Sequence, residues 1–232
     1  MPIVWHYRSN SRSNLWINLH HLLRPLKEEP GAFLWGTEAS GFQHLVKVAA
    51  DGTATALTQG EWMVEGLAGV DETAGTVWFT GTKEDPRERH LYRVPLTGGE
   101  VVRLTHEPGM HGVKLDHGRE HFVDTWHTVD QPPRAVLRRL HDGSEVRELF
   151  RSADPRVQEL GLEPPRMVTL TTADGTALHG AVYVPEGDGP WPVMVSVYGG
   201  PHAQRVQNSW TLTADLRAQA LRSRGILVVT LD

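Results

Sequence analysis

The fold class of this chain follows from His44-Leu45-Val46-Lys47-Val48 and from the Leu57-Thr58 pair that ends the same segment. The segment occurs again as His90-Leu91-Tyr92-Arg93-Val94, ending at Leu104-Thr105, about 46 residues later. Self-similarity at a fixed period of this length is typical of proteins built from repeated structural units. Each copy has the alternation and the turn of a β-hairpin, so the sequence predicts repeated hairpins.

A third copy follows about 45 residues further on, with Ala135-Val136-Leu137-Arg138-Arg139 and the turn Asp142-Gly143. A strand rich in aromatic and β-branched residues precedes each hairpin, over 33–37, 77–82 and 122–126. A further strand opens each unit, over 19–26, 64–70 and 112–115. Four short antiparallel strands per repeat are typical of a β-propeller blade. Residues 16–151 are therefore predicted to form about three blades.

Three blades are fewer than the roughly four to eight that close a propeller ring. We therefore expect a partial propeller, corresponding to C-terminal blades, whose first blade has an unpaired edge. The alternative is a small antiparallel sandwich with coincidental spacing, and the threefold repeat argues against it.

The sequence pattern changes after the third repeat. Prolines 155, 164 and 165 flank a short helical stretch at 157–162, so residues 152–166 are predicted to be a linker. Asp174-Gly175 then separates two alternating segments and predicts an outer antiparallel hairpin. The apolar runs Val193–Val197 and Ile226–Leu231 are predicted to be central strands of a parallel sheet, buried on both faces.

A helix is predicted between these two runs. Leu212, Leu216, Ala220 and Leu221 fall at helical spacing, Thr211 or Thr213 is the expected cap, and Gly225 follows the end. A hairpin that leads into a strand-helix-strand unit is how an α/β-hydrolase sheet begins, although many open α/β sheets begin in the same way. Residues 167–232 are accordingly predicted to be the N-terminal part of an α/β-hydrolase domain.

Composition excludes several classes of function. The net charge of -5 and the pI of about 6.2 give no basic footprint for nucleic acid. The chain has no cysteine, and its 13 histidines include no HExxH, so neither a metal nor another cofactor is expected. No secretory signal or transmembrane run is visible, so we expect a cytoplasmic protein that does not enter membranes.

The most informative stretch for chemistry is Val195-Ser196-Val197-Tyr198-Gly199-Gly200-Pro201-His202-Ala203-Gln204. It ends a predicted strand at the edge where open α/β sheets bind their ligands. Acyl transfer needs hydrogen-bond donors aimed at the oxyanion, and α/β-hydrolases take one from the loop after this strand. Gly199 and Gly200 suit such a loop, because they let the backbone approach a substrate closely.

This stretch resembles the dipeptidyl peptidase IV family of prolyl oligopeptidase-type serine peptidases. The resemblance implies that Tyr198 is the oxyanion donor and that Tyr198, Gly199 and Gly200 bind the substrate. It extends over residues 16–232 and leaves residues 1–15 unassigned. Five further segments carry it: Thr172–Thr176, Trp191–Val193, Gly60-Glu61-Trp62, Glu88–Tyr92 and His121–Thr125.

Other polar residues in these segments are expected to be structural. Glu61-Trp62 and Arg89-His90 are assigned to packing, His202 to the loop, and Glu28-Glu29 to a solvated turn rather than to the family's amine-binding glutamate pair. No GxSxG nucleophile elbow occurs in the chain, and in the family the serine, Asp and His lie beyond the position of Asp232. The chain is therefore expected to be a fragment that lacks the catalytic triad and is inactive alone.

The resemblance implies a serine exopeptidase that, when complete, releases dipeptides from peptide N-termini, with proline or alanine second. The resemblance is also compatible with a homodimer of the complete protein. Two alternatives stay open: another propeller-capped serine hydrolase, such as an acylaminoacyl peptidase or a prolyl oligopeptidase, and a non-catalytic propeller protein that serves in interactions.

Overall fold

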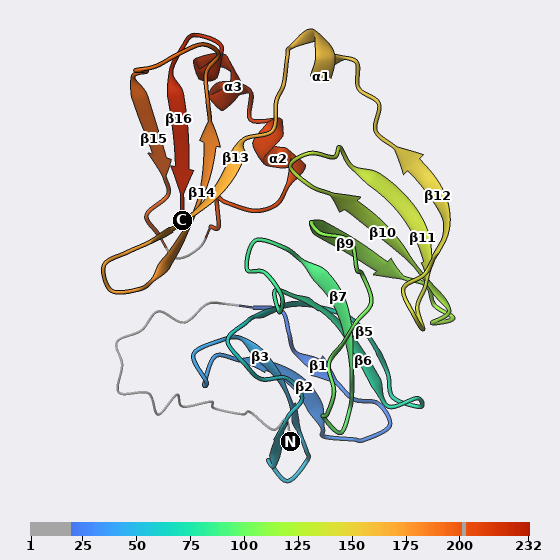
Figure 1. Cartoon of the computed structure of the whole chain (residues 1–232). Helices are drawn as coiled ribbons and strands as arrows, with labels where there is room; N and C mark the ends of the chain where they lie inside the picture. The colour runs from blue at the N-terminus through green and yellow to red at the C-terminus, as the bar shows by residue number, and fades with distance from the viewer. Residues whose placement is uncertain (1–19, 201–202) are drawn as a thin grey trace.

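The computed structural model of the chain describes residues 20–200 and 203–232, and within them it contains four four-stranded sheets (Figure 1). The first sheet contains β1 (Arg24–Pro25), β2 (Phe33–Thr37), β3 (His44–Val48) and β4 (Ala54–Ala56). The second contains β5 (Val64–Asp71), β6 (Thr76–Gly81), β7 (His90–Pro95) and β8 (Val102–Arg103). The third contains β9 (Met110–Leu115), β10 (His121–His127), β11 (Arg134–Arg139) and β12 (Glu145–Arg151).

These three sheets have the strand order and pairing expected of propeller blades. In each of them the strands are antiparallel and lie in the order of the sequence. Leu91 and Tyr92 point to opposite faces of β7, so Tyr92 joins a core shared with the first sheet and Leu91 a core shared with the third. The sheets are therefore stacked face to face in chain order, and the predicted repeat is confirmed as a propeller-like arrangement.

A hydrogen-bonded latch explains why the repeat pairs a histidine with a distant threonine. His44 Nδ1 lies 3.1 Å from Thr58 Oγ1, and His90 Nδ1 lies 3.2 Å from Thr105 Oγ1. The threonine oxygens also accept the backbone N–H groups that follow each histidine, at 2.9 and 3.0 Å. Each latch ties the start of the third strand to the segment after the fourth, which closes the blade.

Replacing Thr105 with valine should lower the free energy of unfolding by about 1–3 kcal/mol. The change keeps the shape of the side chain but leaves the Leu91 N–H and His90 Nδ1 buried without their partner. Urea unfolding of both proteins measures the difference. Thr55→Val, on an exposed position of β4, is the matched control and should have little effect; equal losses in the two variants would contradict a stabilising latch.

The third repeat replaces the latch with a buried charge cluster. Asp124 on β10 accepts hydrogen bonds from His111 Nδ1 at 2.8 Å and from Arg138 Nε at 2.9 Å. His111 Nε2 lies 2.9 Å from the Glu107 carbonyl oxygen, and Arg138 also pairs with the Glu107 carboxylate at 3.0 Å. The Asp124, His111 and Arg138 side chains are almost fully buried, so this blade is held from the inside by paired charges.

The fourth sheet contains β13 (Arg166–Thr171), β14 (Ala177–Tyr183), β15 (Val193–Val197) and β16 (Leu227–Leu231), in the order β13-β14-β16-β15. β13 and β14 form the predicted antiparallel hairpin, and β15 and β16 are parallel. The chain between β15 and β16 carries α2 (Trp210–Thr213) and α3 (Leu216–Arg222), while α1 (Arg156–Glu159) lies in the connection from the third sheet. None of these helices, within the described residues, is long and apolar enough to cross a membrane.

Three expectations for these elements are wrong. β15 is an edge strand rather than a central one, and Val193, Val195 and Val197 are each more than half exposed. The predicted single helix is two helices, because the side chains of Ser209 and Asp215 accept N–H groups at two separate helix starts. The caps are thus neither Thr211 nor Thr213. Leu216 and Ala220 are exposed.

The first strand of the first blade is shorter, within the described residues, than the sequence predicts. The described part of the predicted strand 19–26 contains only the two-residue β1, and residues 1–19 lie outside the described residues. Gly225 does follow the end of α3 with a positive φ of 79°, as the sequence predicts.

Candidate functional site

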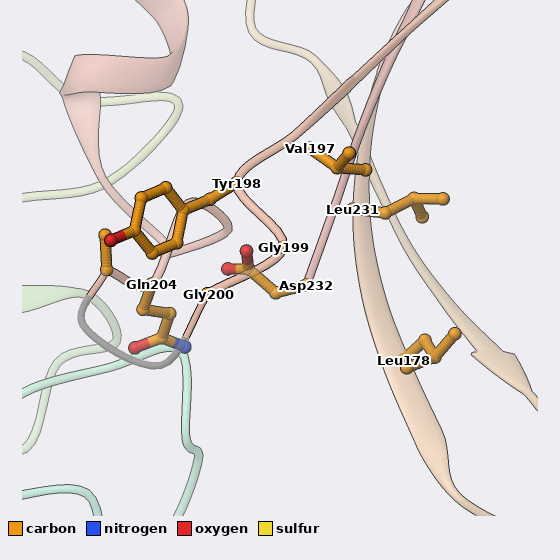
Figure 2. Close-up of a pocket in the computed structure, with 9 residues that line it drawn as sticks. Leu178, Val197, Tyr198, Gly199, Gly200, Gln204, Leu231 and Asp232 are labelled. Atoms are coloured by element: carbon orange, nitrogen blue, oxygen red, sulfur yellow. The ribbon is translucent and has the colours of Figure 1, made fainter. Parts of the chain in front are cut away.

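An open pocket of about 720 Å³ lies at the carboxyl ends of the parallel strands β15 and β16 (Figure 2). This edge is where open α/β sheets bind their ligands. The three predicted site residues, Tyr198, Gly199 and Gly200, all line the pocket. The other lining residues are Leu178, Val197, Ala203, Gln204, Leu231 and Asp232.

The two glycines shape the loop that carries Tyr198. Gly199 has a φ of 69°, in the left-handed region that disfavours residues with a Cβ. A Cβ on Gly200 would lie 2.8 Å from Cε1 of Tyr198, so the tyrosine ring rests directly on this glycine. Tyr198 is 47% exposed, which leaves its side chain accessible from the pocket. Figure 2 shows the ring on the other side of the glycine backbone from Val197 and Leu231.

Asp232 fixes the far side of the same loop. Its Oδ2 accepts the backbone N–H groups of Arg205 and Val206, both at 2.5 Å. The carboxylate at the end of β16 therefore holds the loop that leaves β15, and the two strand ends are joined at the mouth of the pocket. Sequence reasoning assigns no role to Asp232; its position directly after a predicted parallel strand is the signal that could have suggested one.

Two side-chain amides connect this loop to the second sheet. Gln204 accepts a hydrogen bond from Arg89 Nη2 at 2.7 Å and donates to the Pro86 carbonyl at 2.9 Å. Asn208 donates to Glu88 Oε1 at 2.8 Å, and its backbone N–H donates to the Arg87 carbonyl at 2.9 Å. The segment just before β7 thus holds the pocket loop from the propeller side.

Glu88 links this contact to the latch inside the second blade. Burial alone would raise the pKa of Glu88, but hydrogen bonds from His90 and Asn208 outweigh it and hold that pKa below its usual value. Burial lowers the pKa of His90, so the ring is neutral near pH 7; its Nε2 donates to Glu88 and its Nδ1 accepts from Thr105. The structural role expected for Arg89-His90 therefore includes contact with the pocket loop.

The third sheet holds the segment that follows the loop. Trp210 N–H donates to His127 Nδ1 at 3.2 Å, and the Thr213 hydroxyl donates to the Val129 carbonyl at 2.5 Å. His127 ends β10 and Val129 follows it, and in Figure 1 α2 lies between the fourth sheet and β10. Burial, with repulsion from His111, lowers the pKa of His127, which keeps Nδ1 free to accept.

Acidification should weaken this contact. The unfolded chain binds a proton on His127 below about pH 6.5, whereas the folded chain resists it, so the stability is full above that pH and is lost as the pH falls through it. The melting temperature of the chain should fall faster between about pH 7.5 and 5.5 than that of His127→Gln, which keeps an acceptor but cannot titrate. Parallel curves for the two proteins would contradict the assignment.

The other described residues that the sequence analysis singled out, such as Trp62 and Glu29, do not line the pocket. Trp62 is buried in the first core, as expected of a packing residue. Glu29 is half exposed and pairs with Lys47 at 2.5 Å, which agrees with a solvated turn. The described residues contain no group of three or more side chains that could hold a metal ion. His202 and its neighbour Pro201 lie outside the described residues.

Comparisons with known proteins agree with this architecture. The sequence model of the Dipeptidyl peptidase IV (DPP IV) N-terminal region matches residues 4–133, more than half of the chain. The match begins before Trp16, so the resemblance given above is too short at its N-terminal end. The crystal structure of Porphyromonas gingivalis dipeptidyl peptidase 4 aligns with a TM-score of 0.77 and 23% identity, over 91% of this chain and 30% of that chain. This likeness shows the fold.

Two relatives match a larger share of the chain than the family model does. Human Dipeptidyl peptidase 8 is 28% identical over 261 residues, which cover 95% of this chain and 29% of that protein. Probable dipeptidyl-aminopeptidase B of Aspergillus fumigatus is 33% identical over 205 residues, which cover 83% of this chain and 22% of that protein. The chain spans less than a third of the length of these relatives. From its blades, its repeat and these matches, the chain belongs to the dipeptidyl peptidase IV family.

Proposed function

We propose that this chain is part of a serine exopeptidase that, when complete, removes dipeptides from the N-termini of peptides, with proline or alanine in the second position. The observation that carries the proposal is the Tyr198-Gly199-Gly200 loop at the carboxyl ends of two parallel strands, beside an open pocket. Relatives named dipeptidyl peptidase and dipeptidyl-aminopeptidase support it. Peptides are accordingly the proposed substrates.

The proposed domains keep the boundaries expected from sequence. Residues 16–151 are blades of a partial propeller, 152–166 a linker, and 167–232 the N-terminal part of an α/β-hydrolase domain. The parallel pair β15 and β16, joined through α2 and α3 and flanked by an antiparallel hairpin, supports the hydrolase assignment.

In the proposed mechanism, a serine attacks the scissile carbonyl, a histidine held by an aspartate takes the serine proton, and the carbonyl oxygen becomes an oxyanion. The Tyr198 hydroxyl donates a hydrogen bond to that oxyanion, and Gly199 and Gly200 let the substrate approach the loop. The nucleophile elbow, the aspartate and the histidine are proposed to lie in a longer polypeptide that continues beyond Asp232, here called the complete protein.

Without those groups the 232-residue chain should not turn over peptides. We expect Gly-Pro-p-nitroanilide to release p-nitroaniline no faster with the chain than in a buffer blank, because oxyanion binding alone forms no acyl-enzyme. Release that a serine-directed fluorophosphonate abolishes would contradict the proposed location of the nucleophile.

The experiment that tests the proposal begins with the DNA on either side of the region that encodes this chain. A GxSxG elbow in frame with Asp232 is expected, and its absence would exclude the serine mechanism. The complete protein is then assayed on three p-nitroanilides: Gly-Pro, N-acetyl-Ala and benzyloxycarbonyl-Gly-Pro. The proposal expects Gly-Pro to be cleaved best. Preference for N-acetyl-Ala indicates an acylaminoacyl peptidase, preference for the blocked Gly-Pro a prolyl oligopeptidase, and no cleavage a non-catalytic protein.

A further inference from the structure

The second propeller-like sheet places a fixed cation beside the pocket loop. Arg89 is 8% exposed, and its Nη1 donates to the carbonyls of Pro86 and Glu88, both at 2.9 Å. Its Nε lies 2.6 Å from a carboxylate oxygen of Glu65. These contacts all lie within the second sheet and its loops. The guanidinium therefore has one orientation that does not depend on the pocket loop.

The remaining guanidinium nitrogen, Nη2, donates to Gln204 Oε1 at 2.7 Å. Arginine can only donate and a backbone carbonyl can only accept, so Arg89 and the Pro86 carbonyl together fix both ends of the Gln204 amide. Hydrogen bonds at both ends of one amide restrain the position of the Gln204 side chain and its rotation.

Gln204 is well placed to transmit that restraint. It lines the same pocket as Tyr198, and Figure 2 shows both side chains at the glycine loop. The next two backbone N–H groups, of Arg205 and Val206, are held by Asp232. Tyr198 thus directly follows the end of β15, and Gln204 lies at a point that is fixed from two sides, by the propeller-like sheet and by Asp232 at the end of β16.

We infer that Arg89 is a positioning residue for the Tyr198 loop and acts through Gln204. The structural part of this inference concerns the loop alone; its catalytic consequence rests on the proposed function. Through Gln204, Arg89 keeps the Tyr198 ring over Gly200, facing the pocket. The segment before β7 thereby connects the propeller-like sheets to the site of the proposed chemistry.

The test uses the 232-residue chain labelled with 3-fluorotyrosine, which gives one ¹⁹F resonance for each of its four tyrosines. Tyr198→Phe identifies the resonance of Tyr198. Arg89→Met should shift and broaden that resonance, Gln204→Ala should do the same, and the double variant should add nothing further. Tyr92, buried on the strand that follows Arg89, reports whether the sheet is intact.

Arg93→Met is the matched control, because Arg93 lies on β7, the strand that follows Arg89, and donates to the His141 carbonyl instead. It should leave the Tyr198 resonance unchanged. An unchanged Tyr198 resonance in Arg89→Met would overturn the inference. If Arg89→Met also moves the Tyr92 resonance, Gln204→Ala decides, since Gln204 contributes nothing to the interior of the sheet: a shifted Tyr198 resonance supports the inference and an unshifted one overturns it.

In the complete protein, Arg89→Met should lower kcat by about 10-fold or more and leave KM nearly unchanged, because a misplaced oxyanion donor costs stabilisation in the transition state alone. A raised KM with an unchanged kcat would overturn the catalytic part. If the wild-type protein cleaves no peptide, the proposed function fails, while the ¹⁹F result still decides whether Arg89 orders the loop.

Discussion

Asp124→Ala should lower the free energy of unfolding by about 3–5 kcal/mol. Asp124 is fully buried on β10, and its carboxylate accepts from His111 at 2.8 Å and from Arg138 at 2.9 Å. Removing it leaves the Arg138 guanidinium buried with only the Glu107 carboxylate at 3.0 Å to balance its charge. Breaking a buried pair costs far more than the pair contributes, because the remaining charge has lost its water as well as its partner.

Urea unfolding of the wild-type chain and the variant measures this loss. Glu148→Gln is the control. Glu148 lies on the exposed outer strand β12 and forms ion pairs with Arg151 on the same strand and with Arg134 on β11, so it should contribute little. Asp124→Asn, which keeps one acceptor oxygen, should fall between the two. A loss for Asp124→Ala as small as that for Glu148→Gln would show that the third blade does not depend on its charge cluster.

Tyr198→Phe should reduce kcat of the complete protein by about 10²–10³-fold, the usual cost of removing one oxyanion donor. The change deletes one oxygen and keeps the ring that rests on Gly200. KM should change little, because the hydroxyl is proposed to bind charge that develops only in the transition state. Steady-state kinetics on Gly-Pro-p-nitroanilide give both parameters.

Tyr183→Phe is the control for this variant. The Tyr183 hydroxyl is buried and donates to the Leu212 carbonyl at 2.7 Å, behind the sheet and away from the pocket. Its loss should lower thermal stability and leave kcat of the folded enzyme near the wild-type value. A kcat for Tyr198→Phe within twofold of wild type would remove the tyrosine from the proposed oxyanion site.

The blades could be predicted from sequence because their signals are local. The latch places a histidine at the start of one strand and a threonine 14 or 15 residues later, so one repeat unit carries the whole pattern. The buried charge cluster of the third blade could not be predicted in this way. There the histidine is His111, on the first strand rather than the third, and the burial of its charged partners cannot be recognised from spacing.

The site residues also differ in whether a local sequence pattern predicts them. Tyr198, Gly199 and Gly200 are contiguous, so one motif predicts that they lie together. The contact between Arg89 and Gln204 joins residues 115 positions apart, and neither sequence segment indicates the other. The edge position of β15 was missed for a related reason: an apolar run such as Val193–Val197 indicates a strand but does not say how many neighbours the strand has.

Mass spectrometry of the peptide products shows whether the complete protein removes dipeptides from a free N-terminus. The complete protein is incubated with a peptide that begins with a free Xaa-Pro and with the same peptide acetylated at its N-terminus. We expect the free peptide to lose its N-terminal dipeptide as one unit and the acetylated peptide to stay intact. Release of single residues, cleavage at an internal proline, or equal cleavage of both peptides would contradict it.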